Sequence, residues 1–271
     1  TGKGIPGVAV TNGISVVVTD KNGVYQIPTS RWAKHVWFSI PAGYEVPVDP
    51  ENGRPMFYSK DFLSTSKQNR TDWVLTPLPA VEDEFTIIAI GDPQCEVESE
   101  ANRFRDETLV DIRATISSAQ TQENRYHNAY AITLGDITFD NTPLWPTMAK
   151  LCSSIKLTNG KSIPIFNCIG NHDHDADRQN DSEATELFIE HVGPTDYSFN
   201  RGQVHFVVMD NIQCTSVEGF GASKTWNYDG GYTGQQITWL ERDLEAVEDK
   251  ANKMVILSGH IPFRAGGNGG G

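Results

Sequence analysis

Four apolar runs in the second part of the chain each end in a glycine followed by a polar side chain, and this repetition limits the fold more than any other feature. FTIIAI precedes GDPQ, AYAITL precedes GD, IPIFNCI precedes GNHD and KMVILS precedes GH. Continuous apolar runs of this length are typical of strands buried on both faces. Glycine permits a sharp turn directly after such a strand. In open α/β sheets, ligands bind at the carboxyl ends of the strands, so these endings predict one site at the edge of one sheet.

Helical segments alternate with these runs. We expect helices from about residue 101 to 119 and in PLWPTMAKLCSSI, SEATELFIEHV and GQQITWLERDLEAVE. Asp181 or Ser182 is expected to cap the third helix, and Thr233 the fourth. YSFN and QVHFVVMD are expected to form a hairpin. The alternation predicts an α/β domain over residues 85–271, with mixed β-sheets flanked by helices.

Residues 1–79 show a different pattern, in which short alternating runs are separated by turns. Asn12-Gly13 and Asn22-Gly23 each lie between strand-like runs, and this dipeptide is the strongest short signal for a β-hairpin. HVWFSI and DWVLTPL are further strand candidates. The pattern predicts an all-β sandwich over residues 1–79. The acidic segment 80–84 is expected to be a linker between the two domains.

The chain is acidic, with 35 Asp and Glu residues against 22 Lys and Arg residues and a formal net charge of −13. A field of this sign repels nucleic acids and anionic membranes, so we expect a small-molecule substrate and no nucleic-acid polymer as partner. No apolar run approaches the roughly 20 residues that span a bilayer, and no transmembrane segment is expected. The oligomeric state does not follow from the sequence.

The side chains at the four strand ends are suitable ligands for divalent metals. Asp92 and Asp136 supply carboxylates, Gln94 and Asn171 supply amide oxygens, and His260 supplies an imidazole. The closely spaced Cys or His pattern of a structural zinc site is absent from the sequence. Two metal ions about 3.5 to 4 Å apart, bridged by a carboxylate, hold a hydroxide and clamp a phosphate for in-line attack. The pattern therefore indicates metal-dependent chemistry on a phosphate ester.

The ordered set D-x-[HQ], GD, GNHD and GH resembles the calcineurin-like metallophosphoesterase superfamily from about Phe85 to the end of the chain. VGPTDYSFNRGQVHFVVMDN and QQITWLERDL are similar to segments of its bacterial secreted members. The resemblance implies two divalent metal ions, which could be Mn, Fe, Zn or Mg. By position, Asp92 and Gln94 would serve the first metal, Asp136 would bridge both, and Asn171 and His260 would serve the second.

The resemblance also implies two catalytic residues within GNHD. His172 would stabilise the transition state or protonate the leaving oxygen, and Asp173 would orient His172 and support its charge. His174, Asp175 and Asp177 follow directly, and we expect them to form a solvated acidic loop at the mouth of the cleft.

The sequence departs from the family pattern in two places. Gln94 stands where many members have a histidine, and an amide oxygen binds metal more weakly than imidazole. The last family motif, GHxH, would supply two further histidine ligands, and it does not occur before the chain ends eleven residues after His260. We therefore expect either that the phosphoesterase domain is incomplete at its C-terminus or that the metal site lacks some of its ligands.

The N-terminal segment GIPGVAVTNGISVVVTDKNGVYQIP, with FSIPAGYE after it, resembles carboxypeptidase-regulatory-like, transthyretin-like or Ig-like modules. Such modules usually begin with one more strand, so the first strand is expected to be missing here. They are usually fused to exported bacterial enzymes. The resemblance therefore implies a periplasmic, cell-surface or secreted location.

The function predicted from these residues is hydrolysis of a phosphomonoester or phosphodiester by attack of a metal-bridging hydroxide. A nucleotide or a phospholipid headgroup is an alternative ester for the same site. A different class of function also stays open, namely a non-catalytic or weakly active cell-surface binding protein that uses the β-sandwich and carries a degenerate phosphoesterase domain. The missing GHxH favours this alternative, and the intact GNHD opposes it.

Overall fold

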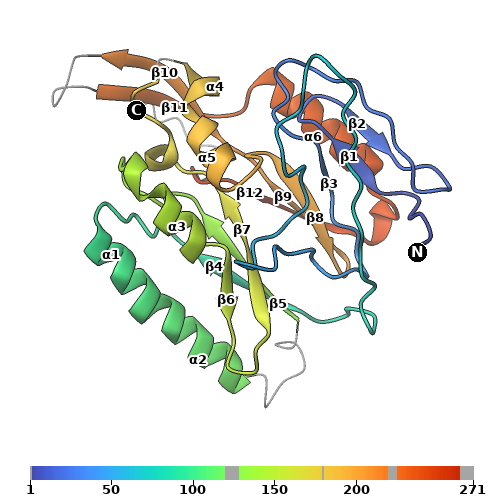
Figure 1. Ribbon diagram of the computed structural model, residues 1–271, viewed down its shortest axis with the longest axis horizontal. Coiled ribbons are helices and arrows are strands. Elements are labelled where there is room, and N and C mark those ends of the chain that lie inside the picture. Colours follow the sequence, from blue (N-terminus) through green and yellow to red (C-terminus); the bar gives the residue numbers. More distant parts are fainter. Residues whose placement is uncertain (1, 120–127, 179, 219–224, 263–271) are drawn as a thin grey trace.

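Two mixed β-sheets form the centre of the molecule (Figure 1). The computed structural model describes residues 2–119, 128–178, 180–218 and 225–262. The first sheet has the order β4-β5-β7-β6, in which β4 (Thr86–Ile90), β5 (Ala129–Leu134) and β7 (Ser162–Cys168) are parallel and β6 (Ser154–Lys156) is antiparallel to β7. The second has the order β12-β9-β8, with β12 (Met254–Ser258) parallel to β9 (Val204–Val208) and β8 (Tyr197–Arg201) antiparallel to it.

The expectation that all four polar strand ends lie on one sheet is wrong. β4, β5 and β7 belong to the first sheet, whereas β12 pairs with β9 in the second. The hairpin of β8 and β9 is confirmed, and its second strand offers β12 a parallel partner. His260 therefore reaches the site from a different sheet than the other candidate ligands.

The two faces of the first sheet serve two separate cores, as the two-residue period of a strand requires. In β5, Ala129 and Ala131 pack into the cluster beneath the helices, while Tyr130 and Ile132 face the second sheet. The second sheet is covered on its far side by α6 (Gly234–Ala246). Trp239 of this helix packs in one buried cluster with Val207 of β9 and with Met209, which directly follows β9. The α/β domain is thus layered as helices, sheet, sheet and helix.

The helices confirm most of the expected positions. α1 (Glu98–Arg103), one π-helical turn (Phe104–Thr108) and α2 (Leu109–Ala119) follow one another directly and lie along one side of the molecule (Figure 1). A 3₁₀ turn (Thr142–Leu144) leads into α3 (Trp145–Leu151), and α4 (Asp181–Ala184) leads into α5 (Glu186–His191). Short 3₁₀ turns also occur at Asn171–Asp173 and Lys250–Asn252.

The caps of two helices test the sequence expectations directly. Thr233 Oγ1 accepts a hydrogen bond from Gln236 N and caps α6, as predicted. The cap of α4 is Asn180, whose Oδ1 accepts from Glu183 N at 3.0 Å, and the prediction of Asp181 or Ser182 is wrong by one or two residues. The structure also contains an antiparallel pair of strands, β10 (Ile212–Glu218) and β11 (Thr225–Gly230), which is not among the elements expected from the sequence.

The N-terminal region contains a three-stranded antiparallel sheet of β1 (Ala9–Thr11), β2 (Val16–Val18) and β3 (Trp37–Phe38) in the order β2-β1-β3. The hairpin predicted at Asn12-Gly13 is present. At Asn22-Gly23 the chain turns, with Gly23 N donating to Asp20 O, but the described residues after this turn contain no strand before β3. The described elements show one small sheet here, and the β-sandwich stays a prediction.

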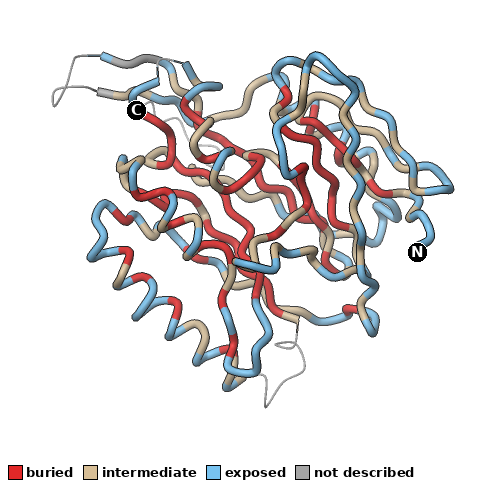
Figure 2. The backbone as a smooth tube through the Cα atoms, in the orientation of Figure 1, coloured by how far each residue is buried: buried red, intermediate tan, exposed pale blue. Residues whose placement is uncertain are grey.

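The N-terminal region shares its core with the α/β domain. Val10, Phe38 and Phe57 belong to the same buried cluster as Phe166 of β7 and Phe199 of β8. A parallel bridge joins Ile40 to Phe199, and Figure 2 shows buried stretches of chain both in the second sheet and in the N-terminal strands. This sharing fixes the N-terminal region against the α/β domain.

The connection between the two regions is also anchored. Glu82 is buried, and its Oε1 accepts a hydrogen bond of 2.6 Å from the Tyr130 hydroxyl. Its Oε2 accepts from Gly202 N and lies 3.7 Å from Nη1 of the fully buried Arg201. The segment expected to be a linker is therefore held in place by a buried carboxylate.

Candidate metal centre

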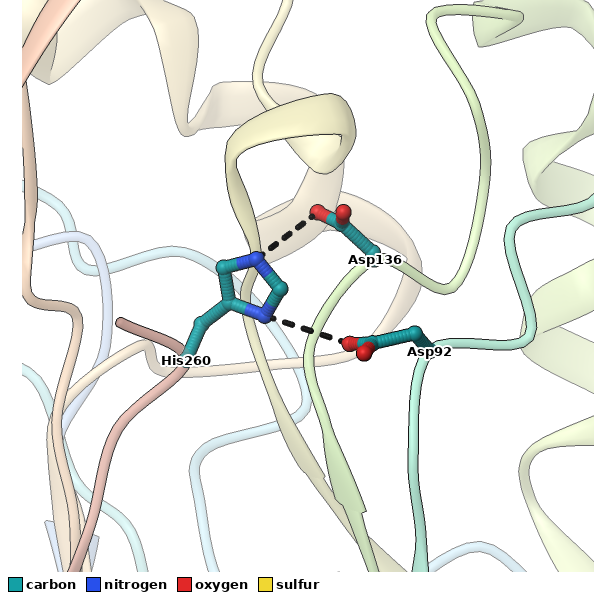
Figure 3. Close-up of side chains that lie close together, drawn as sticks. All are labelled: Asp92, Asp136 and His260. Carbon is teal, nitrogen blue, oxygen red and sulfur yellow. Dashed lines mark ion pairs between the residues drawn. The ribbon is translucent and has the colours of Figure 1, made fainter. Parts of the chain in front are cut away.

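Five candidate ligands lie together where four strands end. Asp92, Asp136 and His260 follow β4, β5 and β12, and one ligand atom from each of the three lies within 4.8 Å of the other two (Figure 3). Gln94 contacts Asp136, and Asn171, which follows β7, contacts His260. The structure thus brings together every residue that the sequence marked as a metal ligand.

The imidazole of His260 lies at the centre of this group. Its Nδ1 is 2.8 Å from the carbonyl oxygen of Leu134, which can only accept, so Nδ1 carries the proton. In the neutral ring, Nε2 then presents a lone pair. This lone pair faces Asn171 Oδ1 at 3.1 Å and Asp136 Oδ1 at 3.4 Å. Three electron-pair donors therefore converge, and a positive charge is the natural partner for them.

The spacing of these donors fits a metal ion. Metal–ligand distances of about 2.1 Å place neighbouring ligand atoms about 3.0 Å apart in octahedral geometry and about 3.4 Å apart in tetrahedral geometry. The distances of 3.1 and 3.4 Å around His260 Nε2 lie in this range. Asp92 Oδ1 lies 3.4 Å from the other ring nitrogen of His260. The donor set, made of carboxylate, amide and imidazole, suits Mn, Fe, Zn or Mg.

The two carboxylate oxygens of Asp136 face different neighbours. Its carboxylate is buried, with one oxygen towards His260 and the other accepting a hydrogen bond of 2.9 Å from Nε2 of Gln94. Oδ1 also accepts from the backbone N–H of His172 at 3.0 Å. A half-turn of the Gln94 amide group exchanges Nε2 for Oε1 and would present an oxygen ligand at the same position.

Glycines make this close approach possible. A Cβ atom on Gly170 would lie 2.1 Å from the backbone nitrogen of Asp136, so no side chain fits there. Gly135 has φ of +96°, and a Cβ at this position would lie 2.6 Å from Nδ1 of His260. Gly170 is therefore required for the space that Asp136 occupies, and Gly135 both for the conformation of the turn and for the space that His260 occupies.

Backbone strain is concentrated at the site. The structure describes five non-glycine residues with positive φ, and four of them follow β4 or β5: Asp92 at 34°, Gln94 at 46°, Asp136 at 49° and Asp140 at 53°. Such conformations cost roughly 1–3 kcal/mol each and persist where the surroundings impose them. Here the loops after β4 and β5 hold each other, since Gln94 N donates to Asp136 O at 2.7 Å.

His172 lies beside the metal ligands and has a defined orientation. Its ring stacks on Phe139 with a centroid distance of 4.0 Å, and Nδ1 lies 3.1 Å from Asp140 Oδ1. The side chain of His172 is one-quarter exposed, so it can meet a substrate. Sequence reasoning missed Asp140, although its position four residues after Asp136 in GDITFD was a signal that could have been used.

The expected pairing of Asp173 with the His172 ring is not what the structure shows. The Asp173 carboxylate is buried and accepts hydrogen bonds from the backbone N–H groups of Gly170, Ile137 and Thr138 at 2.9, 3.1 and 2.8 Å. Burial raises its pKa to about 6, although these three donors act in the opposite direction. Asp173 therefore ties the loops after β5 and β7 together, and the carboxylate beside His172 is that of Asp140.

The prediction of a solvated acidic loop is also wrong for His174 and Asp175, which are both buried. His174 Nδ1 donates to the carbonyl of Gly170 at 2.9 Å, and Nε2 lies 3.3 Å from Asp210 Oδ2. Burial lowers the pKa of His174, but the Asp210 carboxylate, the Gly170 carbonyl and Asp181 together outweigh this effect and the net shift is upward. Of the three, only Asp177 is exposed as expected.

Comparison with known families agrees with this geometry. A model of the calcineurin-like phosphoesterases matches residues 85–271, which is more than half of the chain. The chain belongs to the calcineurin-like phosphoesterase family. A second model, which describes the N-terminal region of calcineurin-like phosphoesterases, matches residues 1–78. A search of curated proteins found no match.

Membership of the calcineurin-like phosphoesterase family identifies the protein as a hydrolase, and the family acts on phosphoesters with divalent metals. The Asp92, Asp136 and His260 group is a possible metal-binding site for that chemistry. Among the described residues, no helix of this phosphoesterase is both long enough and apolar enough to cross a membrane.

Proposed function

We propose that this calcineurin-like phosphoesterase hydrolyses a small phosphomonoester or phosphodiester with two divalent metal ions. The observation that carries the proposal is the convergence of Asn171 Oδ1, Asp136 Oδ1 and His260 Nε2, whose residues follow three strands in two sheets. Such a group of acceptors is costly to bury unless a cation joins it.

The bound metal ions would supply Lewis-acid chemistry, by activating water and offsetting charge on the phosphate. Asp92 and Gln94 are the candidate ligands of the first ion, Asn171 and His260 those of the second, and Asp136 is shared. The strained backbone at Asp92, Gln94 and Asp136 sets the direction of their side chains before any ion binds, which lowers the cost of ordering the site.

The chain's own acid–base group in this proposal is His172. Asp140 accepts from Nδ1–H and stabilises positive charge on the ring, so Nε2–H of the charged form can donate to the leaving oxygen. Stacking on Phe139 restricts rotation of the ring and keeps its proton aimed in one direction. Asp173 contributes indirectly, because it fixes the loop from which His172 projects.

The charge distribution supports a small substrate. The formal net charge of −13 opposes a long polyanion, while bound divalent ions give the site itself a positive potential. The proposal includes export to the periplasm, cell surface or medium of a bacterium, which is supported by the resemblance of the N-terminal segment to modules of exported enzymes.

The test uses p-nitrophenyl phosphate and bis(p-nitrophenyl) phosphate as substrates, with and without added Mn²⁺. We expect Mn²⁺-dependent release of p-nitrophenol that chelation and Asp136→Ala both abolish. Asp106→Ala is the matched control, because Asp106 is an exposed aspartate paired with Arg105 on the helical side of the domain. Activity that survives chelation and Asp136→Ala would refute the mechanism. A wild-type protein that binds Mn²⁺ but releases no product would favour the non-catalytic binding function instead.

A further inference from the structure

The segment that carries His260 is not held by regular secondary structure. The parallel ladder between β9 and β12 ends at the pair Val208 and Ser258, and its last hydrogen bond runs from Met209 N to Ser258 O at 3.0 Å. His260 lies two residues beyond this point. Because the ring comes from the second sheet while the other ligands come from the first, its position depends on the bond from Nδ1 to Leu134 O and on support of the backbone on either side of it.

The side chain of Asn211 provides this support. Its Nδ2 donates to the carbonyl oxygen of Ile261 at 2.7 Å, and its Oδ1 accepts from Ile261 N at 3.0 Å. A primary amide offers the same donor and acceptor as a peptide unit. Asn211 therefore continues the pairing of β9 and β12 by two further hydrogen bonds, beyond the point where the backbones of the two strands separate.

Asn211 is itself firmly placed. Only 3% of its surface is exposed, and its carbonyl oxygen accepts a hydrogen bond of 2.9 Å from Gly231 N, just after β11. The fit against the neighbouring chain is close, since a Cβ on Gly259 would lie 2.9 Å from Nδ2 of Asn211. The residues on both sides of His260 are thus held by Asn211, one by packing and one by two hydrogen bonds.

We propose that Asn211 is a positioning residue, which sets His260 Nε2 against Asp136 and Asn171 and so determines how tightly the second metal is bound. Both hydrogen bonds of the Asn211 side chain go to the backbone of Ile261, and Asn211 acts on His260 through this residue and through its packing against Gly259. This proposal rests on the proposed function, because it takes His260 to be a metal ligand.

The variant that tests it is Asn211→Leu, which keeps the approximate shape of the side chain and removes both hydrogen bonds. The matched control is Asn12→Leu, because Asn12 is also 3% exposed and also holds backbone groups, those of Ile14, Ser15 and Pro28, in the N-terminal region. His260→Ala serves as the reference for complete loss of the ligand. Should Asn211→Leu fail to fold, Asn211→Asp, which keeps the acceptor for Ile261 N but loses the donor, takes its place.

Two measurements separate positioning from folding. Calorimetric titration with Mn²⁺ is expected to show an affinity about 10- to 100-fold lower for the Asn211 variant and unchanged for Asn12→Leu. Long-range ¹H–¹⁵N spectra of the metal-free protein, with the His260 signals assigned through His260→Ala, are expected to show one tautomer in the wild type and a mixture in the Asn211 variant.

The outcomes distinguish the positioning proposal from the proposed function. If Asn211→Leu binds Mn²⁺ as the wild type does and its His260 signals are unchanged, Asn211 does not position the ring. If wild type and His260→Ala bind Mn²⁺ equally, His260 is not a ligand and the proposed function fails in this respect. In that case the spectra alone decide whether Asn211 holds the ring.

Discussion

Oδ1 of Asp140 lies 3.1 Å from Nδ1 of His172, and the two residues belong to loops that follow different strands, β5 and β7. A carboxylate at Nδ1 fixes the orientation and the protonated nitrogen of the imidazole, and it stabilises the charged ring. The backbone joins the same pair a second time, because Asp140 N donates to His172 O at 3.1 Å. Asp140 and His172 therefore form a unit that is joined both by side chains and by backbone.

Substitution of Asp140 tests this unit. We expect Asp140→Asn to lower kcat by about 10- to 100-fold, since it removes the charge that supports His172 as an acid. KM and the stoichiometry of bound Mn²⁺ should stay the same, because Asp140 is not a candidate ligand. Asp72→Asn, at an exposed residue of the N-terminal region, is the control. A loss of Mn²⁺ together with activity would show that Asp140 acts on the metal site instead.

A methyl group at Gly170 should disrupt the site. The Cβ of Gly170→Ala would collide with the Asp136 backbone at 2.1 Å, and the loop after β5 or β7 must move to relieve it. We expect a loss of about 2 kcal/mol or more in unfolding free energy and loss of Mn²⁺ binding. Gly91→Ala is the matched control, since a Cβ there meets no atom within 4 Å. Equal melting temperatures for the two variants would contradict the close approach of the two loops.

The buried carboxylate of Glu82 should contribute strongly to stability. Glu82→Ala leaves the Arg201 guanidinium buried without its acidic partner, and removal of one member of such a pair costs about 3–5 kcal/mol. Glu84→Ala, two residues further along and exposed, should change stability by about 0.5 kcal/mol or less. Urea unfolding of both variants measures the difference. Similar midpoints for the two would mean that the connecting segment is not anchored.

His35 should make the stability of the protein depend on pH. Burial lowers its pKa to about 4, against a usual value of 6.5, and its neutral ring contacts Ser59 Oγ at 3.1 Å. The pKa is lower in the folded state, so the stabilisation is complete above pH 6.5 and is lost as the pH falls towards 4. Between pH 7 and pH 5 the unfolding free energy of the wild type should fall by about 1 to 2 kcal/mol more than that of His35→Gln. Parallel curves for the two proteins would contradict this assignment.

Much of the site followed from local sequence. A buried strand that ends in glycine and a polar residue places that residue at a sheet edge whatever the details of the fold, and this is why Asp92, Asp136 and Asn171 could be named in advance. His260 was placed on the wrong sheet, because its position depends on the pairing of β12 with β9, which is a contact between segments about 50 residues apart.

The errors concern charged residues within tight loops. Asp173 was expected to face the ring of His172, and His174 was expected to face the solvent. Both side chains instead point inwards and bind backbone groups of the loops, the N–H of Thr138 and the carbonyl of Gly170. A local pattern does not show which backbone N–H groups lack partners, since that depends on how three loops meet. Asp140 was missed for the same reason, because only the fold brings it to His172.

The aromatic contact between the two regions has a consequence for how this protein can be divided. The ring of Phe57 lies 4.8 Å from that of Tyr197, measured between centroids, and 6.2 Å from that of Phe166. A fragment that begins at residue 79 would expose these rings of the phosphoesterase domain to water and would be prone to aggregate. Residues 1–78 are therefore not an independent module. Fusion of this region to another enzyme would succeed only if that enzyme carried a matching aromatic surface.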